Sequence, residues 1–308
     1  MESIHRTVLL KETIEGLNLP SSKAGKQNNS LVLDGTFGGG GHSFEILSKY
    51  PNVKVIALDQ DKSAWEKAKS KFKGLESRIT FVNKNFREMD KLEESFNGII
   101  FDLGLSSDQL ENSGRGFSFV KDEPLLMTMK ENPEEEDVTA REVVNTWEEK
   151  NLADIIYGYG EERYARRIAK AIVEARREVE IKTTFDLVKI IEGAVPAVYR
   201  RGRINPATRT FQALRIAVND ELGALSDGLE KAFNKLKIGG RLSVISFHSL
   251  EDRIVKKFYS AKGGSASGGK ENRFANVITK KPITASEEEL KNNPRSRSAK
   301  LRVLEKII

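Results

Sequence analysis

The chain has 308 residues, of which 38% are hydrophobic and 31% are charged, a composition typical of folded globular domains. It contains no cysteine, which excludes disulfides, zinc–thiolate sites, iron–sulfur clusters and thiol nucleophiles, and its 3 histidines argue against a histidine-rich metal site. Lysine plus arginine exceed aspartate plus glutamate by 51 to 45, so the net charge of +6 allows a polyanionic partner.

The sequence gives no sign of a membrane or secretory segment. No apolar run approaches the roughly 20 residues that cross a bilayer, and residues 1–10 lack the apolar region of a signal peptide. We therefore expect a cytoplasmic protein with no membrane partner.

The segment Leu31–Ser43 predicts a ligand-binding loop. Its first residues form a short buried strand, and a helical pattern resumes at Phe44. Between the two lie four glycines, which have no side chains and precede His42: Gly38, Gly39, Gly40 and Gly41. Glycines let a backbone approach a ligand closely, and the free N–H groups of a helix start favour electron-rich ligand atoms. A flexible surface turn is the alternative interpretation.

A second buried strand, Val53–Leu58, ends at Asp59, 25 residues after Asp34. In nucleotide-binding α/β folds an acidic residue at about this distance accepts hydrogen bonds from ribose hydroxyls. Asp34 closes the first strand, and a carboxylate directed into the loop suits a cationic ligand better than a pyrophosphate. S-adenosyl-L-methionine carries an ammonium and a sulfonium, so we favour this methyl donor. A nicotinamide dinucleotide, and with it an oxidoreductase, remains the alternative.

A further buried strand runs through residues 98–101 and places Asp102 at its carboxyl end. Ligands of open α/β sheets bind beyond the carboxyl ends of the strands, so Asp34, Asp59 and Asp102 should converge on one crevice. Each of them could also serve only as a helix cap or a turn former.

After Asp102 the alternation of strand and helix stops, and from Asp137 to Val198 every periodic segment is helical. Strand character returns at Lys237–Phe247. We therefore predict a Rossmann-like α/β methyltransferase domain formed by residues 1–108 and 210–308, with residues 109–209 inserted as an all-helical domain.

Several local patterns refine this organisation. Apolar spacing predicts one long helix over Arg209–Leu225, and Ser249 with Asp252 matches a capping box that begins the helix after the returning strand. Residues 21–30 and 262–270 are polar or rich in glycine and serine, and they predict surface loops.

Clustered arginines predict contacts with nucleic acid. Loop guanidinium groups pair bidentately with phosphates, whereas most arginines on helices merely form a solvated face. The candidates for RNA binding lie in one loop, at the start of the following helix and in the tail: Arg200, Arg201, Arg203, Arg209, Arg295 and Arg297.

Seven segments in order along the chain resemble the MraW/RsmH family almost from end to end. They are residues 34–43, 102–110, 115–119, 159–169, 206–216, 246–256 and 293–298. This resemblance implies an S-adenosyl-L-methionine-dependent methyltransferase that modifies the exocyclic N4 amine of one cytosine in 16S ribosomal RNA, near the decoding centre of the small ribosomal subunit.

The same resemblance implies which residues contact the methyl donor, and it implies that the helical insertion helps to hold RNA. The implied donor contacts are Gly40, Gly41, His42, Asp59, Phe86, Asp102 and Gln109. Two segments depart from the usual family sequence. Asp108 stands where the family usually has proline, and Leu126–Lys130 lacks an acidic and a basic side chain expected near the target base.

The chemistry requires an acceptor for a proton of the weakly nucleophilic cytosine amine, and we assign Asp102 to this role. Phe247, at the end of the returning strand, is our candidate for stacking on the unstacked base, with Phe117 and Phe119 as alternatives. Phe247 could equally be a core residue. A catalytically weak RNA-binding factor for ribosome assembly remains a second alternative function, and a homodimer remains open.

Overall fold

The computed structural model describes residues 7–20, 29–130, 133–134, 136–264 and 273–308, in two compact units. One unit comprises Met1–Leu105 and Leu222–Ile308, and the other comprises Ser106–Glu221. The divisions fall at 105/106 and 221/222, whereas the sequence analysis placed them at 108/109 and 209/210. Helix α10 (Ala207–Asn219) belongs to the inserted unit because it packs on helices α5, α6 and α8 of that unit. The predicted loops over 21–28 and 265–270 lie outside the described residues.

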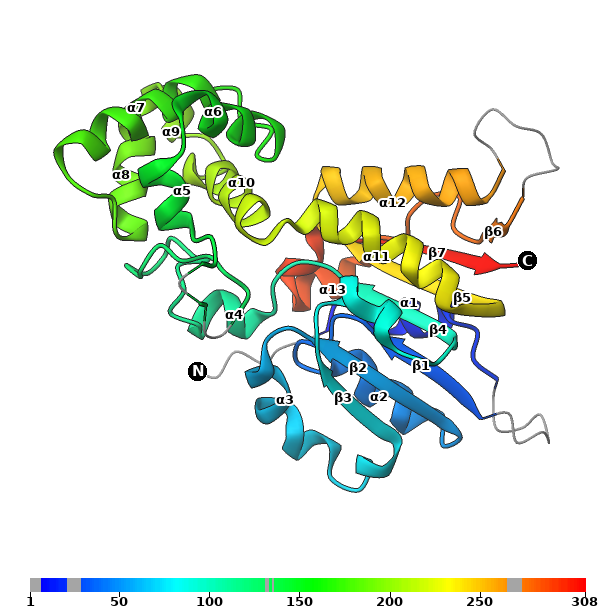
Figure 1. The fold of residues 1–308 in the computed structure, drawn as a ribbon. Coiled ribbons are helices and arrows are strands. Elements are labelled where there is room, and N and C mark those ends of the chain that lie inside the picture. The colour runs from blue at the N-terminus through cyan, green and yellow to red at the C-terminus, as the bar shows by residue number, and fades with distance from the viewer. Residues whose placement is uncertain (1–6, 21–28, 131–132, 135, 265–272) are drawn as a thin grey trace. The chain divides into compact units, whose positions relative to one another are not determined.

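The first unit contains a seven-stranded sheet with the strand order β3-β2-β1-β4-β5-β7-β6 (Figure 1). Strands β1 to β5 pair in parallel, and β7 is antiparallel to both β5 and β6. The strands are β1 Ser30–Asp34, β2 Val53–Asp59, β3 Ile79–Asn83, β4 Phe96–Asp102, β5 Leu236–Ser246, β6 Ala275–Val277 and β7 Lys300–Lys306. This is the Rossmann-like α/β class predicted from the sequence.

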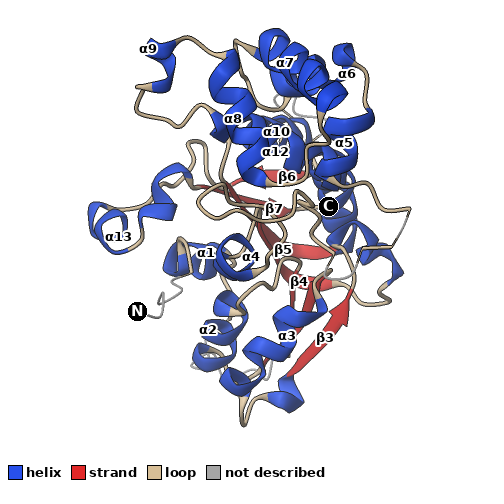
Figure 2. Ribbon diagram, turned by 90° about the vertical axis from the view of Figure 1, so that its left-hand side faces the viewer, coloured by secondary structure: helices blue, strands red, loops and turns tan. Residues whose placement is uncertain are grey.

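Helices cover both faces of this sheet, because neighbouring strand residues point to opposite sides. In β1, Val32 packs toward α1, α2 and α3, whereas Leu33 packs toward α11 and α12. The α-helices of this unit, drawn in blue in Figure 2, are α1 Leu10–Gly16, α2 Gly41–Lys49, α3 Lys62–Ala68, α11 Glu221–Lys235, α12 Ser249–Lys262 and α13 Glu287–Asn292. Short 3-10 helices cover Lys69–Phe72, Glu76–Arg78, Phe86–Lys91 and Pro294–Ser298.

In its described residues the second unit consists of helices and loops, and an isolated bridge joins Pro124 and Thr183. Helix α7 packs against α5, α6 and α8 around buried aliphatic side chains such as Ile168 and Ile172. Its helices are α4 Ser107–Asn112, α5 Ala140–Thr146, α6 Glu149–Gly158, α7 Ala165–Glu178, α8 Thr184–Ala194, α9 Ala197–Arg200 and α10 Ala207–Asn219. Among the described helices of either unit, none combines the length and apolarity needed to cross a bilayer.

The structure corrects two local predictions. The long helix predicted over Arg209–Leu225 breaks at Asp220, whose φ of 46° ends α10 before α11 begins. The capping box of α12 is formed by His248 and Glu251. Asp252, which the sequence analysis had placed in that box, instead accepts a hydrogen bond from Nε of Arg302 at 2.7 Å.

Candidate functional site

The glycine loop joins β1 to α2 as predicted, and its backbone needs glycine. Gly38 and Gly40 have φ values of 50° and 67°, in the left-handed region that favours glycine. A Cβ atom on Gly40 would stand 2.7 Å from Cζ of Phe37, and one on Gly41 would stand 1.7 Å from Oγ1 of Thr7. The loop is therefore closely supported by neighbouring side chains, and a flexible surface turn does not describe it.

An aromatic cluster, Phe37, Trp65, Phe72 and Phe81, provides this support. The ring of Phe37 lies 5.7 Å from the rings of both Phe72 and Phe81, and Trp65 stacks on Phe81 at 5.5 Å. Trp65 lies in α3, and Phe72 ends the 3-10 helix that follows it. Only the fold brings Phe37 and these residues together.

Asp34 closes β1 and is buried. The hydroxyl of Ser43 donates to its Oδ2 at 2.6 Å, and the backbone N–H of Thr36 donates to its Oδ1 at 3.3 Å. Burial nevertheless raises the pKa of Asp34 from 3.8 to about 6. Asp34 therefore holds the two ends of the glycine loop together and keeps a carboxyl group that titrates close to neutral pH.

Asp59 ends β2 and contacts the glycine loop directly. The N–H of Gly38 donates to its Oδ2 at 2.8 Å, and the N–H of Asp61 donates to its Oδ1 at 2.9 Å. Burial raises the pKa of Asp59 to about 6 despite these bonds. Each carboxylate oxygen can accept more than one hydrogen bond, so Asp59 retains acceptor capacity for a ribose hydroxyl.

Asp102 ends β4, next to β1, and its backbone N–H donates to Oγ1 of Thr36 at 2.6 Å. The three carboxylates therefore meet at the carboxyl ends of three adjacent strands, as predicted. Oδ2 of Asp102 lies 3.8 Å from Nδ1 of His42, and its Oδ1 is buried with no hydrogen-bond partner among the described residues. Burial, together with the charges of Asp34 and Glu251, raises the pKa of Asp102 well above its ordinary value.

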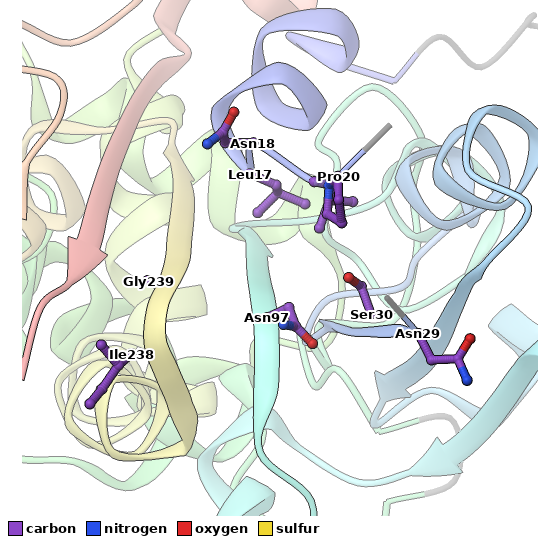
Figure 3. A pocket seen from close by; sticks show the side chains of 9 residues that line it. Leu17, Asn18, Pro20, Asn29, Ser30, Asn97, Ile238 and Gly239 are labelled. Atoms are coloured by element: carbon purple, nitrogen blue, oxygen red, sulfur yellow. The ribbon is translucent and has the colours of Figure 1, made fainter. Parts of the chain in front are cut away.

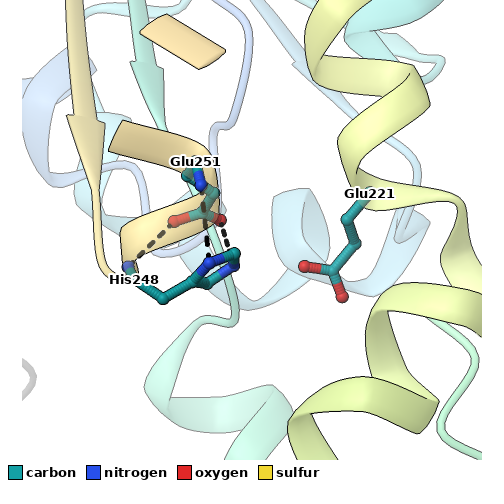
Figure 4. A group of neighbouring side chains, drawn as sticks. All are labelled: Glu221, His248 and Glu251. Carbon is teal, nitrogen blue, oxygen red and sulfur yellow. Dashed lines mark hydrogen bonds and ion pairs between the residues drawn. The ribbon is translucent and has the colours of Figure 1, made fainter. Parts of the chain in front are cut away.

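Glu251 is a residue of this region that sequence reasoning missed. Its Oε2 accepts a hydrogen bond from the backbone N–H of Phe247 at 2.8 Å. It accepts a second one from the backbone N–H of His248 at 3.3 Å (Figure 4). The ring of Phe247 is partly buried beside the Leu9 and Leu301 core cluster, and it lies close to Gly104. Glu251 therefore fixes the backbone that carries the predicted stacking residue.

Phe86 begins the 3-10 helix after β3, and its ring packs on Phe101 of β4 at 4.8 Å. A Cβ atom on Gly35, in the loop, would lie 3.3 Å from Cβ of Phe86. Phe86 is thus beside the start of the glycine loop. Gln109 belongs to the helical unit, where it completes the capping box of α4 with Ser106. Gly39 is exposed, and its carbonyl accepts a hydrogen bond from Nζ of Lys71 at 3.4 Å.

The candidate RNA-binding arginines differ in exposure. Arg295 and Arg297 are exposed on the 3-10 helix Pro294–Ser298 of the first unit. Arg200, Arg201 and Arg203 are exposed in the helical unit. Arg209 is partly buried, and its Nη1 lies 3.9 Å from Oε2 of Glu162.

The alternative stacking residues of the helical unit are packed inside it. Phe117 is buried, and Phe119 contacts the ring of Phe211 at 5.2 Å. We therefore retain Phe247 as the candidate for base stacking.

A separate hollow lies at the amino-terminal ends of the parallel strands, beside the beginnings of β1 and β4 (Figure 3). Its lining includes Asn18, Ser30 and Asn97, and Oδ1 of Asn97 already accepts a hydrogen bond from the backbone of Leu31 at 3.0 Å. This hollow is remote from the three strand-end carboxylates, because they lie at the opposite ends of the same strands.

The glycine loop and the three strand-end carboxylates fit a cationic nucleoside ligand. A bare loop offers close backbone approach, Asp59 offers acceptor capacity, and the unpartnered oxygen of Asp102 offers a site for positive charge. No positively charged side chain of the described chain is hydrogen-bonded to Asp34, Asp59 or Oδ1 of Asp102. A pyrophosphate would meet three carboxyl groups here, which disfavours a dinucleotide.

The chain matches the model of the MraW methylase family over residues 2–307. It is also similar to proteins named "Ribosomal RNA small subunit methyltransferase H". The protein from Synechococcus elongatus is 48% identical, with 99% of this chain and 95% of that protein covered. The protein from Acaryochloris marina is 49% identical, covering 98% and 94%. The protein from Heliobacterium mobile is 46% identical over 100% of both chains.

Proposed function

Because this chain belongs to the MraW methylase family, we propose that it transfers a methyl group from S-adenosyl-L-methionine to the N4 amine of one cytidine in 16S ribosomal RNA. The family membership and the methyltransferase fold class predicted from the motifs are thereby confirmed. Membership of a methylase family also removes the support for a nicotinamide-dependent oxidoreductase. The observation that carries the proposal is the meeting of Asp34, Asp59 and Asp102 around the glycine loop.

The loop and the carboxylates hold the methyl donor in this proposal. Asp59 binds the ribose hydroxyls, and Asp34 with Asp102 provides the negative charge that a sulfonium compound requires. We assign the remaining contacts to Gly39, Gly40, Gly41, His42, Phe86 and Gln109. When bound, S-adenosyl-L-methionine supplies an electrophilic methyl group on its sulfur.

Asp102 acts on the acceptor amine. The lone pair of a cytosine amine is delocalised into the ring, so the nitrogen attacks well only when a neighbouring acceptor takes up a hydrogen bond from its N–H. Oδ1 of Asp102 is buried and unpartnered, which suits this role. Phe247 stacks on the base and holds the nitrogen in line with the methyl group, and this positioning supplies most of the acceleration.

The substrate we propose is 16S ribosomal RNA in the small ribosomal subunit, near the decoding centre. The names of the similar proteins from Synechococcus elongatus and Heliobacterium mobile support a small-subunit ribosomal RNA substrate. Exposed arginines in both units, Arg200, Arg201, Arg203, Arg295 and Arg297, supply phosphate contacts. This substrate places the enzyme in the cytoplasm. A homodimer stays a prediction, which light scattering coupled to gel filtration checks.

The test is incubation of the protein with isotopically labelled methyl donor and small subunits from a strain that lacks the enzyme, followed by mapping of the modified nucleotide. We expect one labelled cytidine that carries the methyl group on N4. Label on another atom or nucleotide would overturn the proposed specificity. Binding of subunits without any methyl transfer would favour the ribosome-assembly factor instead.

A further inference from the structure

The carboxylate of Glu162 is completely buried in the helical unit, and its partners come from three separate segments. The backbone N–H of Tyr164 donates to Oε1 at 2.8 Å, and the hydroxyl of Tyr199 donates to Oε2 at 2.5 Å. Nη1 of Arg209 lies 3.9 Å from Oε2 and donates to the Tyr199 hydroxyl at 3.3 Å. Because a buried charge must be paired, this network holds α9 against the start of α7.

Arginines surround the outside of this network. The guanidinium of Arg163 lies over the rings of both Tyr164 and Tyr199, at 4.9 and 4.8 Å, and that of Arg167 lies over Tyr164 at 5.8 Å. Arg163 is exposed, and the exposed Arg200, Arg201 and Arg203 follow Tyr199 in the chain. We call Arg163, Arg167, Arg200, Arg201 and Arg203 the arginine surface.

The segment that carries three of these arginines contributes no negative charge of its own. From Pro196 to Arg209 the chain has four arginines and no aspartate or glutamate. None of the five arginines has an ion-pair partner among the described residues of the helical unit. Arg209 differs, because its guanidinium faces the buried Glu162.

Apolar side chains are exposed beside these charges. The exposed fraction of Val198 is 85%, and that of Ile204 is 55%. Phosphates pair with guanidinium groups, whereas unstacked bases pack on apolar side chains and on guanidinium planes. A duplex hides its base faces, so this combination fits a single strand better than a duplex.

We propose that the arginine surface binds the phosphates and unstacked bases of single-stranded ribosomal RNA, and that Arg209 is a positioning residue of this surface through Glu162 and Tyr199. This inference rests on the proposed function, and it identifies where the substrate is held on the helical unit. It adds Arg163 and Arg167 to the candidate RNA contacts and removes Arg209 from them.

The test measures binding of a short fluorescein-labelled single-stranded RNA by anisotropy at several salt concentrations. The first variant replaces Arg200, Arg201 and Arg203 by alanine together. Three lost phosphate contacts should lower the slope of log affinity against log salt by about 2, and should weaken binding by roughly tenfold or more at physiological salt. Arg163→Ala should lower the slope by about 0.7.

Matched variants separate this role from a general effect of charge. Arg177→Ala removes an exposed arginine from the last turn of α7, and it should leave both affinity and slope near the wild-type values. Replacement of Arg200, Arg201 and Arg203 by lysine should restore the slope, because lysine also neutralises phosphate. Calorimetry of S-adenosyl-L-methionine binding should give the wild-type affinity for every variant, and thermal unfolding should give the wild-type midpoint, which shows that both units remain folded.

Three results would overturn the inference. One is a triple alanine variant that binds the RNA with wild-type affinity and slope. Another is an equal loss in Arg177→Ala. The third is a higher affinity of the wild-type protein for polyglutamate than for the RNA, which would indicate an acidic protein partner. If the proposed N4 specificity is wrong, the wild-type enzyme will methylate another atom or nucleotide, and the mapping experiment will show this. The binding measurements described here would not change.

Discussion

Oδ2 of Asp102 lies 3.8 Å from Nδ1 of His42, so the carboxyl group that ends β4 faces an imidazole from the first turn of α2. The backbone N–H of Asp102 is held by Thr36 of the glycine loop. These contacts fix one side of the carboxyl group and leave Oδ1 unpartnered among the described residues. The free oxygen is the feature on which the proposed chemistry depends.

Asp102→Asn should therefore separate stability from function. The amide keeps the shape of the side chain but cannot accept a proton or carry negative charge, so turnover should fall by about 100-fold or more and donor binding should weaken. The raised pKa of Asp102 means that the wild-type protein loses stability as pH rises through that pKa. The variant lacks this loss, so at pH 8 it should unfold at a higher temperature than the wild type.

Single-turnover methyl transfer, donor calorimetry and thermal unfolding check this prediction. Asp90→Asn is the control, because Asp90 is an exposed carboxylate that pairs with Lys231. It should leave turnover and donor affinity unchanged. Full turnover and unchanged donor affinity in Asp102→Asn would show that Asp102 is not the acceptor.

Donor binding should depend on pH through Asp34 and Asp59, whose pKa values are both raised to about 6 by burial. A cation binds the ionised carboxylates, so affinity should rise from pH 5 to pH 7, with release of protons on binding. Without ligand the sign is opposite: the stability that these groups contribute is complete below about pH 4 and is lost as pH rises through about 6. Calorimetry in two buffers with different ionisation heats measures the released protons. An affinity that is flat or falls over this range would contradict the prediction.

Gly40→Ala should damage the donor site. Its φ of 67° is strained for alanine, and the new Cβ would meet the rings of Phe37 and Phe72 at 2.7 and 2.9 Å. We expect a destabilisation of roughly 2–4 kcal/mol, from backbone strain and overpacking, and a loss of donor affinity of at least about tenfold.

Gly74→Ala is the matched control for this prediction. Gly74 has a φ of 84°, but a Cβ there would meet nothing within 4 Å. It should show only the strain, about 1–2 kcal/mol, with unchanged donor affinity. Equal effects of the two variants on donor affinity would show that the packing under the loop does not matter.

Phe247→Leu should lower methyl transfer to small ribosomal subunits and leave donor affinity unchanged. Stacking on a base contributes about 1–3 kcal/mol, so a loss of roughly tenfold in kcat/KM is expected. Phe274→Leu, at an exposed phenylalanine beside β6, controls for the loss of a ring. If Phe247→Leu instead lowers only stability, Phe247 is a core residue. Its packing against the cluster that contains Leu9 would then account for the lost stability.

The convergence of the three strand-end carboxylates was predictable because its signals are local. Buried strands that end in Asp34, Asp59 and Asp102, with glycines after the first, place the carboxyl groups at one sheet edge once the strands are parallel. The break at Asp220 was not predictable from periodicity. Apolar spacing continues across it, and aspartate enters the left-handed region often enough to end a helix without glycine or proline.

Other features depend on partners that are distant in the sequence. Arg209 flanks the arginine-rich loop in the sequence, and only the fold places it beside the buried Glu162. Asp252 has the spacing of a capping residue, but Arg302 of β7 pairs with it, and Glu251 takes its place in the cap. Neither partner could be identified without the tertiary structure.

Tyr199→Phe should test the network around Glu162, because it removes the hydroxyl that donates to Oε2 of Glu162 and leaves the ring under Arg163. A buried carboxylate that loses a donor should destabilise the helical unit by about 1–3 kcal/mol. Loosening of α9 should also weaken RNA binding several-fold while the salt slope stays unchanged, since every arginine remains. Tyr164→Phe is the control, because the structure gives its hydroxyl no hydrogen bond. Denaturant unfolding and RNA anisotropy measure the two effects. Wild-type RNA affinity in a destabilised Tyr199→Phe would confine the network to a role in folding.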